Sequence, residues 1–171
     1  AIRNAGIIYA KPGFAVKIAA SDADSGLKEV SVTLDGKEFE PLKKNSFVFD
    51  QPGKYSFQIM AEDAGGNSEY SNPYVIIVDN APPKTTYQSI REIIKENDLF
   101  ITKVPNTIRF RGRDEGVGLA YVEFSFNNKD FSKNPEPIDF GTWRTPRRTL
   151  YFRGVDYLGN AEPVKAMDIL V

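Results

Sequence analysis

The sequence contains no cysteine and no histidine. Without cysteine there is no disulfide framework, no thiolate zinc site and no cysteine nucleophile. Without histidine the chain lacks the most frequent general base and transition-metal ligand, and every Ser-His or Cys-His catalytic arrangement. Paired carboxylates or a Ser-Lys dyad stay open as catalysts, but no spacing singles out such a pair. The sequence therefore predicts that this chain is not an enzyme.

Long apolar runs and strong charge of one sign are also lacking. No apolar run reaches the roughly 18 residues of a membrane-spanning helix, and the N-terminus lacks the basic-then-apolar pattern of a signal peptide. The net charge is −1, with 8 Lys and Arg against 11 Asp and Glu up to residue 83, and 14 against 12 thereafter. These values argue against membrane insertion and against nonspecific nucleic-acid binding, which needs a strongly basic surface.

What the sequence does contain is an internal repeat. Six residues recur at an offset of 92 positions: Asp22, Gly26, Leu27, Val30, Lys37 and Phe39 match Asp114, Gly118, Leu119, Val122, Lys129 and Phe131. A later landmark recurs at an offset of 93: Asp63, Gly66, Asn67 and Glu69 match Asp156, Gly159, Asn160 and Glu162. We therefore predict two domains in tandem, residues 1–80 and 81–171, each large enough to bury a small core.

Apolar and polar residues alternate with a period of two inside each copy. The pattern runs through residues 14–20, 30–34 and 55–61 in the first copy, and through 108–112, 122–126 and 150–154 in the second. Period two indicates half-buried strands, and Gly- and Pro-rich turn signals separate them. About seven short strands per copy predict an all-β fold made of two tandem immunoglobulin-like antiparallel β-sandwich domains.

The segment Ser89 to Asn97 has no equivalent in the first copy. Ser89 and Glu92 have the spacing of a capping box, and Ile90, Ile93 and Ile94 would share one helical face. This pattern predicts a short helix, with an extended strand as the alternative.

Two recurring motifs carry a family resemblance. An Asp-x-x-x-Gly-Leu stretch opens one strand, and a later apolar strand ends in Asp63-Ala64-Gly65-Gly66-Asn67 or Asp156-Tyr157-Leu158-Gly159-Asn160. Over nearly the whole chain the sequence resembles the bacterial immunoglobulin-like repeats of large cell-surface and secreted proteins. That resemblance implies extracellular display, and adhesion or spacing. The linker Asp79-Asn80-Ala81-Pro82 is also similar to cadherin interdomain linkers.

Acidic and amide side chains gather in the loops that should share one pole of each sandwich. Oxygen ligands of this kind suit Ca²⁺, the one cofactor the sequence suggests. The candidate ligands in these loops are Asp22, Asp24, Asp63, Asn67, Asp114, Glu115, Asp156 and Asn160. The linker residues Asp79 and Asn80 are expected beside the loops of the second copy, where they could complete an interdomain calcium site. The alternative is that these residues only form turns, since Asp and Asn accept hydrogen bonds from nearby backbone and tolerate left-handed conformations.

A group of arginines and the single tryptophan are the candidates for ligand binding. Arg109, Arg111 and Arg113 should point out of one sheet face, and Arg144, Arg147 and Arg148 are expected on the segment beside them. Forked guanidinium groups could hold carboxylate, sulfate or phosphate, for instance on an acidic glycan; the alternative is a solvated surface. Trp143 is either an exposed contact residue or a cover for the edge of the core.

Together these features predict a noncatalytic tandem segment of a bacterial surface or secreted protein, acting as a spacer or an adhesion module. Its partners would be a surface glycan or a host or matrix protein, with flanking domains of a longer chain. The alternative is an accessory region of a secreted carbohydrate-active enzyme or protease, which presents the catalytic domain or binds its polysaccharide.

Overall fold

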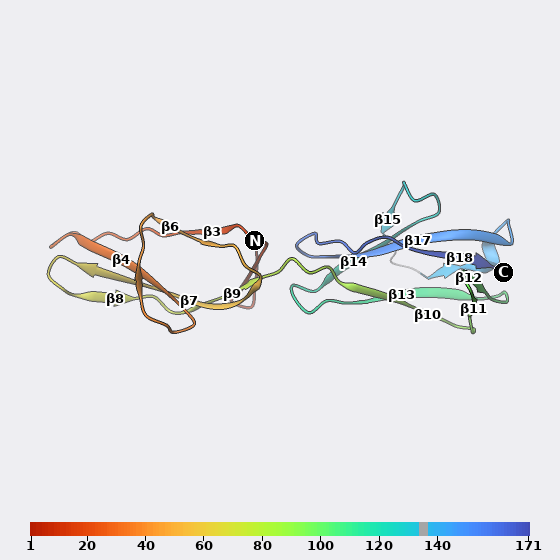
Figure 1. Cartoon of the computed structure of the whole chain (residues 1–171), viewed down its shortest axis with the longest axis horizontal. Helices are drawn as coiled ribbons and strands as arrows, with labels where there is room; N and C mark the ends of the chain where they lie inside the picture. Colours follow the sequence, from red (N-terminus) through yellow and green to blue (C-terminus); the bar gives the residue numbers. More distant parts are fainter. Residues whose placement is uncertain (134–136) are drawn as a thin grey trace. The chain divides into compact units, whose positions relative to one another are not determined.

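The computed structural model describes residues 1–133 and 137–171, which divide into two units, Ala1–Asn80 and Ala81–Val171. Within the described residues each unit consists of β-strands and loops, apart from the single 3-10 turn η1, Phe140–Thr142 (Figure 1). No helix of the described part is long and apolar enough to cross a membrane. The predicted all-β class is therefore confirmed.

The first unit pairs its strands in two sheets. The larger sheet has the order β1-β2-β9-β7-β4-β5, with β8 also paired to β7, and the smaller one pairs β3 with β6. The strands are β1 Ile2–Asn4, β2 Ile7–Ala10, β3 Phe14–Lys17, β4 Leu27–Leu34, β5 Glu40–Pro41, β6 Ser46–Phe49, β7 Gly53–Asp63, β8 Ser68–Tyr70 and β9 Tyr74–Val78.

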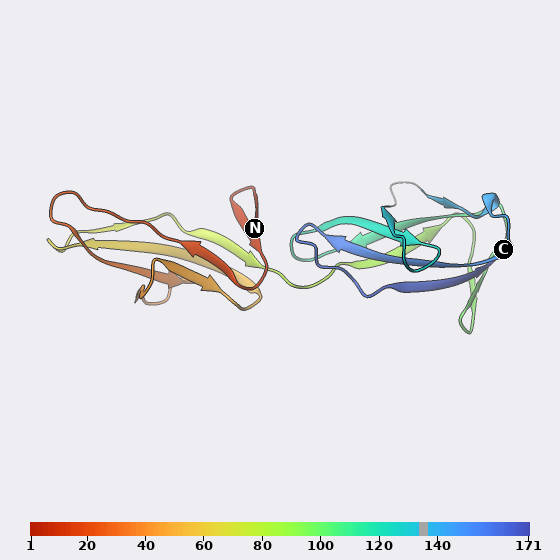
Figure 2. The same ribbon diagram turned by 90° about the horizontal axis from the view of Figure 1, so that it is seen from above.

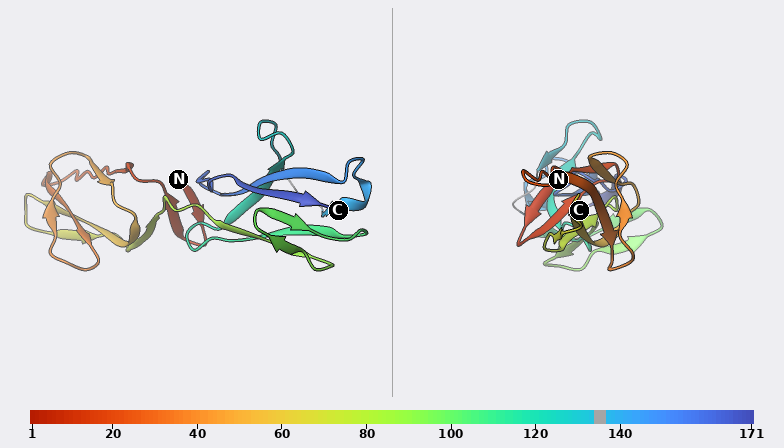
Figure 3. Two further views of the ribbon diagram at one scale, coloured as in Figure 1. Left: turned by 45° about the vertical axis from the view of Figure 1, so that its right-hand side comes forward. Right: turned by 90° about the vertical axis from the view of Figure 1, so that its left-hand side faces the viewer.

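The second unit is also a sandwich of two sheets, which form separate layers in Figure 1 and in the left panel of Figure 3. The larger sheet has the order β11-β12-β18-β17-β14-β15, and the smaller one the order β10-β13-β16. The strands are β10 Lys84–Ser89, β11 Ile94–Glu96, β12 Leu99–Ile101, β13 Thr107–Arg113, β14 Leu119–Ser125, β15 Ser132–Lys133, β16 Ile138–Asp139, β17 Arg147–Asp156 and β18 Lys165–Leu170.

The two units share one strand order. In the first, β2 lies parallel to β9, which continues through antiparallel β7 and β4; in the second, β12 lies parallel to β18, which continues through β17 and β14. The facing sheet contains the pair β3-β6 in the first unit and β13-β16 in the second. A three-strand centre facing a second sheet, with chain connections that cross between them, is the immunoglobulin-like arrangement. The predicted immunoglobulin-like sandwich is therefore confirmed.

Each sandwich is closed by its own apolar core. In the first unit Phe57 and Ile76 are fully buried, and the rings of Phe47 and Phe49 pack on Phe57 with centroids 5.3 and 5.4 Å away. In the second unit Ile108, Leu150 and Ile169 are fully buried. The inward positions are those that the period-two pattern predicts, since successive side chains of a strand point to opposite faces.

The predicted helix at residues 89–97 is wrong, and the strand alternative is right. β10 continues to Ser89, and Ile94–Glu96 forms β11 in a hairpin with β12, which pairs with β18 (Figure 2). The buried side chain of Asn106 accepts a 2.9 Å hydrogen bond from the backbone N–H of Arg91 and donates one of 3.2 Å to its carbonyl. These bonds satisfy the backbone where the chain crosses between sheets, so a helix is not needed there.

Candidate functional site

The acidic loops of the first unit form turns. Asp22 accepts hydrogen bonds from the backbone N–H groups of Asp24 at 3.1 Å and Gly26 at 2.7 Å. Asp63 accepts from the side-chain amide and the backbone N–H of Asn67, both at 2.8 Å, and these bonds hold the pKa of its carboxyl below the ordinary value. Gly66 supplies the left-handed conformation between them, with φ of 88°.

The acidic loops of the second unit repeat this geometry and bring two carboxylates together. Asp114 accepts from the backbone N–H of Gly116 at 3.0 Å and of Gly118 at 2.7 Å. Asp156 accepts from the backbone and the side-chain amide of Asn160, both at 2.7 Å. One carboxylate oxygen of Asp114 lies within 4.8 Å of one of Asp156. This pair is oxygen-rich, as Ca²⁺ requires, although its oxygens also serve the turns.

Three further predicted calcium ligands are Glu115, Asp79 and Asn80. Glu115 is exposed and lies 3.9 Å from the guanidinium of Arg113. The backbone N–H of Asp79 donates to the carbonyl of Ala10 at 2.8 Å at the end of the first unit, and Asn80 follows it. That Asp79 and Asn80 complete a calcium site stays a prediction.

The predicted arginine cluster is divided between two sheets. Arg109, Arg111 and Arg113 lie exposed on β13, as expected. Arg147 and Arg148 lie on β17, and Arg144 lies in the exposed segment before it. The expectation that the two groups occupy neighbouring segments is wrong, because β13 pairs with β10 and β16 whereas β17 pairs with β14 and β18.

The second group of arginines has structural partners. The guanidinium of Arg147 makes a two-pronged contact with the carboxylate of Asp168, which raises the pKa of Arg147 and lowers that of Asp168. The guanidinium of Arg148 lies 3.8 Å from the ring centroid of Phe126, in cation–π geometry. Both arginine side chains therefore already have partners within the second unit.

Trp143 covers the edge of the core. Its indole is half-buried, and it packs on the buried ring of Phe140 with centroids 4.9 Å apart and edge-on to Phe126 at 5.8 Å. Of the two interpretations of this tryptophan, the structure favours the packing role.

Glu162 links the two sheets of the second unit, a role that no motif in the sequence predicts. Its carboxylate is buried and accepts hydrogen bonds from the backbone N–H of Thr85 and of Gly154, both at 2.8 Å, and from the ammonium of Lys165 at 2.6 Å. Burial alone would raise the pKa of this carboxyl, but these hydrogen bonds lower it below its ordinary value. Its match to Glu69 in the repeat was the only signal in the sequence.

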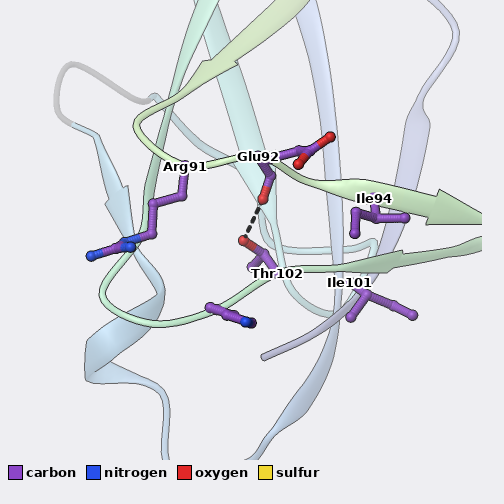
Figure 4. Close-up of a pocket in the computed structure, with 6 residues that line it drawn as sticks. Arg91, Glu92, Ile94, Ile101 and Thr102 are labelled. Atoms are coloured by element: carbon purple, nitrogen blue, oxygen red, sulfur yellow. Dashed lines mark hydrogen bonds between the residues drawn. The ribbon is translucent and has the colours of Figure 1, made fainter.

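A pocket of about 320 Å³ opens where β10 crosses toward β11 (Figure 4). Ile94 and Ile101 face each other across the hairpin, and Arg91, Glu92 and Lys103 line the rest. Figure 4 shows the hydroxyl of Thr102 donating to the carbonyl of Glu92, a bond of 2.9 Å. The Thr102 hydroxyl in the pocket wall therefore fixes the backbone of the segment that connects β10 to β11.

No family model matches the chain, and no curated protein matches its sequence. Among solved structures, the fibronectin(III)-like modules of CbhA from Clostridium thermocellum align at 12% identity over 96% of this chain and 88% of that one, with a TM-score of 0.43. An amphioxus IgVJ-C2 molecule aligns at 14% identity over 96% and 100%, with a TM-score of 0.41.

The SGBP-B protein of a Bacteroides ovatus mixed-linkage glucan utilization locus, in complex with a mixed-linkage heptasaccharide, aligns at 14% identity. The alignment covers 96% of this chain and 45% of that one, with a TM-score of 0.28. The fold assignment therefore rests on the strand order of the two units themselves.

Proposed function

We propose that this chain is a noncatalytic immunoglobulin-like segment of a bacterial surface or secreted protein, and that it acts as a binding module or spacer. The observation that carries this proposal is geometric: the carboxylates of Asp63, Asp156 and Glu162 each accept hydrogen bonds from groups of the same sandwich. The directions of the pKa shifts agree with this. Each shifted group is displaced toward its charged form: Asp63, Glu162 and Asp168 downward, Lys28 and Arg147 upward. A general acid or base that works near neutral pH needs the opposite displacement.

The partners of these groups support the same proposal. Lys28 pairs with Glu62 at 2.7 Å, and Glu162 pairs with Lys165. These contacts join neighbouring strands and loops of a sandwich, as structural ion pairs do. The loops that carry Asp63 and Asp156 hold their shape through hydrogen bonds that Asn67 and Asn160 donate to these carboxylates. These polar groups are thus used for folding, and the exposed sheet faces are left for contact with partners.

The test is an activity screen of the purified chain against polysaccharides, glycosides, esters and peptides, together with a glycan array. We expect no turnover. Turnover that is lost on replacing Asp156 with Asn or Glu162 with Gln, in a variant that still folds, would overturn the proposal.

The second candidate is an accessory region of a secreted carbohydrate-active enzyme or protease. The gene around this segment separates the two candidates. A hydrolase domain in the same chain favours the accessory region, whereas further sandwich repeats and a surface anchor favour the adhesive or spacing role.

A further inference from the structure

The outward side chains of β10 and β13 form a polar surface, here called the basic strip. The strands are antiparallel, and Lys84 lies opposite Arg113, Thr86 opposite Arg111, and Gln88 opposite Arg109. All six side chains are exposed, while the alternate residues of both strands, such as Thr85 and Phe110, point inward. The basic strip therefore presents four cations, one hydroxyl and one amide on a single sheet face.

These cations differ from Arg147 and Arg153 of the opposite sheet, which have carboxylate partners. Arg147 is paired with Asp168, and Arg153 with Glu123 at 2.6 Å. In the basic strip, the bond that Arg111 makes to the residues described is to the amide oxygen of Gln88, at 3.2 Å. Arg113 has one loose contact of 3.9 Å with Glu115, where both side chains stay more than 80% exposed (84% and 86%).

The other two cations of the basic strip, Lys84 and Arg109, have no ion pair within residues 1–133 and 137–171. The positive charge is therefore largely uncompensated at the strip itself. In the described part of the chain, carboxylates stand at the two ends of the strip. Asp139 is opposite Thr107 on β16, and Asp114 and Glu115 follow β13.

A groove of about 530 Å³ lies beside the strip, and Lys84, Thr86, Arg111 and Arg113 line it, with Asp114 and Glu115 of the following loop at its end. Alternate residues of a strand are about 6.8 Å apart, so the three arginines of β13 extend over roughly 14 Å in a row. A linear ligand with repeated negative charges fits such a row better than a compact ion does.

We propose that the basic strip binds a linear acidic polysaccharide that carries carboxylate or sulfate groups. Guanidinium groups bond such oxyanions through two parallel N–H donors. Gln88 and Thr86 lie between the cations and supply hydrogen bonds for sugar hydroxyls. This assignment rests on the proposed function as a binding module and names the chemical class of its ligand.

Nucleic acid and membrane surfaces fit the strip less well. The strip has no aromatic side chain on which a base could stack, and no apolar side chain that could enter a lipid layer. The chain as a whole is slightly acidic, which disfavours long polyanions that need a broad basic surface.

The test measures binding of the full chain to polygalacturonate by calorimetry at low salt, beside neutral dextran and a single-stranded oligothymidylate. We expect binding to polygalacturonate that weakens as salt shortens the screening length, and none to dextran. The variant R109Q/R111Q/R113Q should bind at least about tenfold more weakly, because charge-assisted hydrogen bonds are lost. The variant with lysine at these positions should fall between the two, since it keeps the charge without the forked donors.

The matched control removes the same charge elsewhere in the second unit. Lys103, Lys129 and Arg144 are exposed and lie outside the strip, so K103Q/K129Q/R144Q should bind as the natural chain does. Equal loss in both triple variants, no binding to polygalacturonate, or tighter binding to oligothymidylate would overturn the assignment. These outcomes concern binding alone. The activity screen tests the noncatalytic proposal independently of them.

Discussion

The carboxylate of Glu162 accepts a 2.8 Å hydrogen bond from the backbone N–H of Thr85, which lies 77 residues earlier in the chain. Thr85 belongs to β10 in the smaller sheet of the second unit, and the other carboxylate oxygen accepts from Gly154 in β17 of the larger sheet. The ammonium of Lys165 donates to the carbonyl of Thr85 at 2.7 Å and closes the network. One buried carboxylate therefore links both layers of this sandwich.

Glu162→Gln is expected to destabilise the second unit by about 2 to 3 kcal/mol at pH 7, because Gln cannot accept at both ends of its amide. The pKa of Glu162 in the folded chain lies below its ordinary value of 4.5. The stability from its charge is therefore complete above that ordinary value and is lost as the pH falls through the lower folded pKa.

Urea unfolding of both proteins at pH 7 and at about pH 3 measures this effect. The difference between natural chain and variant should shrink at the lower pH, and an equal difference at both values would contradict the prediction. Glu69→Gln, at the matching and exposed position of the first unit, is the control and should change stability little.

Gly154→Ala is expected to cost about 1 to 3 kcal/mol of stability, since overpacking a buried contact forces its neighbours apart. A Cβ at this position would lie 2.4 Å from the hydroxyl oxygen of Thr85. Among the residues that the structure describes, that buried oxygen has no hydrogen-bond partner, so Thr85→Ala alone should cost less than Gly154→Ala. In a double-mutant cycle, Thr85→Ala should recover part of the loss. Strict additivity of the two changes would contradict the predicted contact.

Millimolar Ca²⁺ is expected to raise the melting temperature of the chain relative to chelator, since a cation that binds only the folded state adds stability by mass action. The approach of Asp114 to Asp156 motivates this expectation. Asp114→Asn keeps the acceptor of the turn but removes the charge, so it should abolish the rise. The matched first-unit variant, Asp22→Asn, should retain it. Melts of the natural chain that superimpose with and without Ca²⁺ would return these residues to turn formation alone.

Arg148→Ala is expected to cost about 1 kcal/mol and to shift the emission of Trp143 to longer wavelength. The reason is that the guanidinium packs over Phe126 and lies 5.6 Å from the indole centroid, so its removal admits water to both rings. Arg144→Ala, at an exposed neighbouring position, should change neither quantity. Unchanged fluorescence in Arg148→Ala would contradict the packing role of this side chain.

Local pattern is enough to predict most of the strands and turns of this chain. The alternation around Phe57 and Phe152 marks the inward faces, because the side-chain period of a strand is two whatever its partners are. The Asp63 and Asp156 loops are readable for the same reason, since their hydrogen bonds join residues only four positions apart. The repeat itself follows from comparing these local patterns along the chain.

The sheet partners of each strand were decided by tertiary structure. Arg111 and Arg148 both belong to arginine-rich stretches of the sequence. Strand pairing nevertheless places Arg111 on an exposed sheet face and Arg148 against the ring of Phe126.

Glu69 and Glu162 match in the repeat, but only Glu162 is buried against a strand that comes from far along the chain. Residues 89–97 carry a helical spacing that contacts with Asn106 override. Local patterns thus determined where strands and turns form, because their interactions join near neighbours. Contacts between distant segments decided which side chains are paired, buried or left exposed to a ligand, because those contacts exist only once the sheets have assembled.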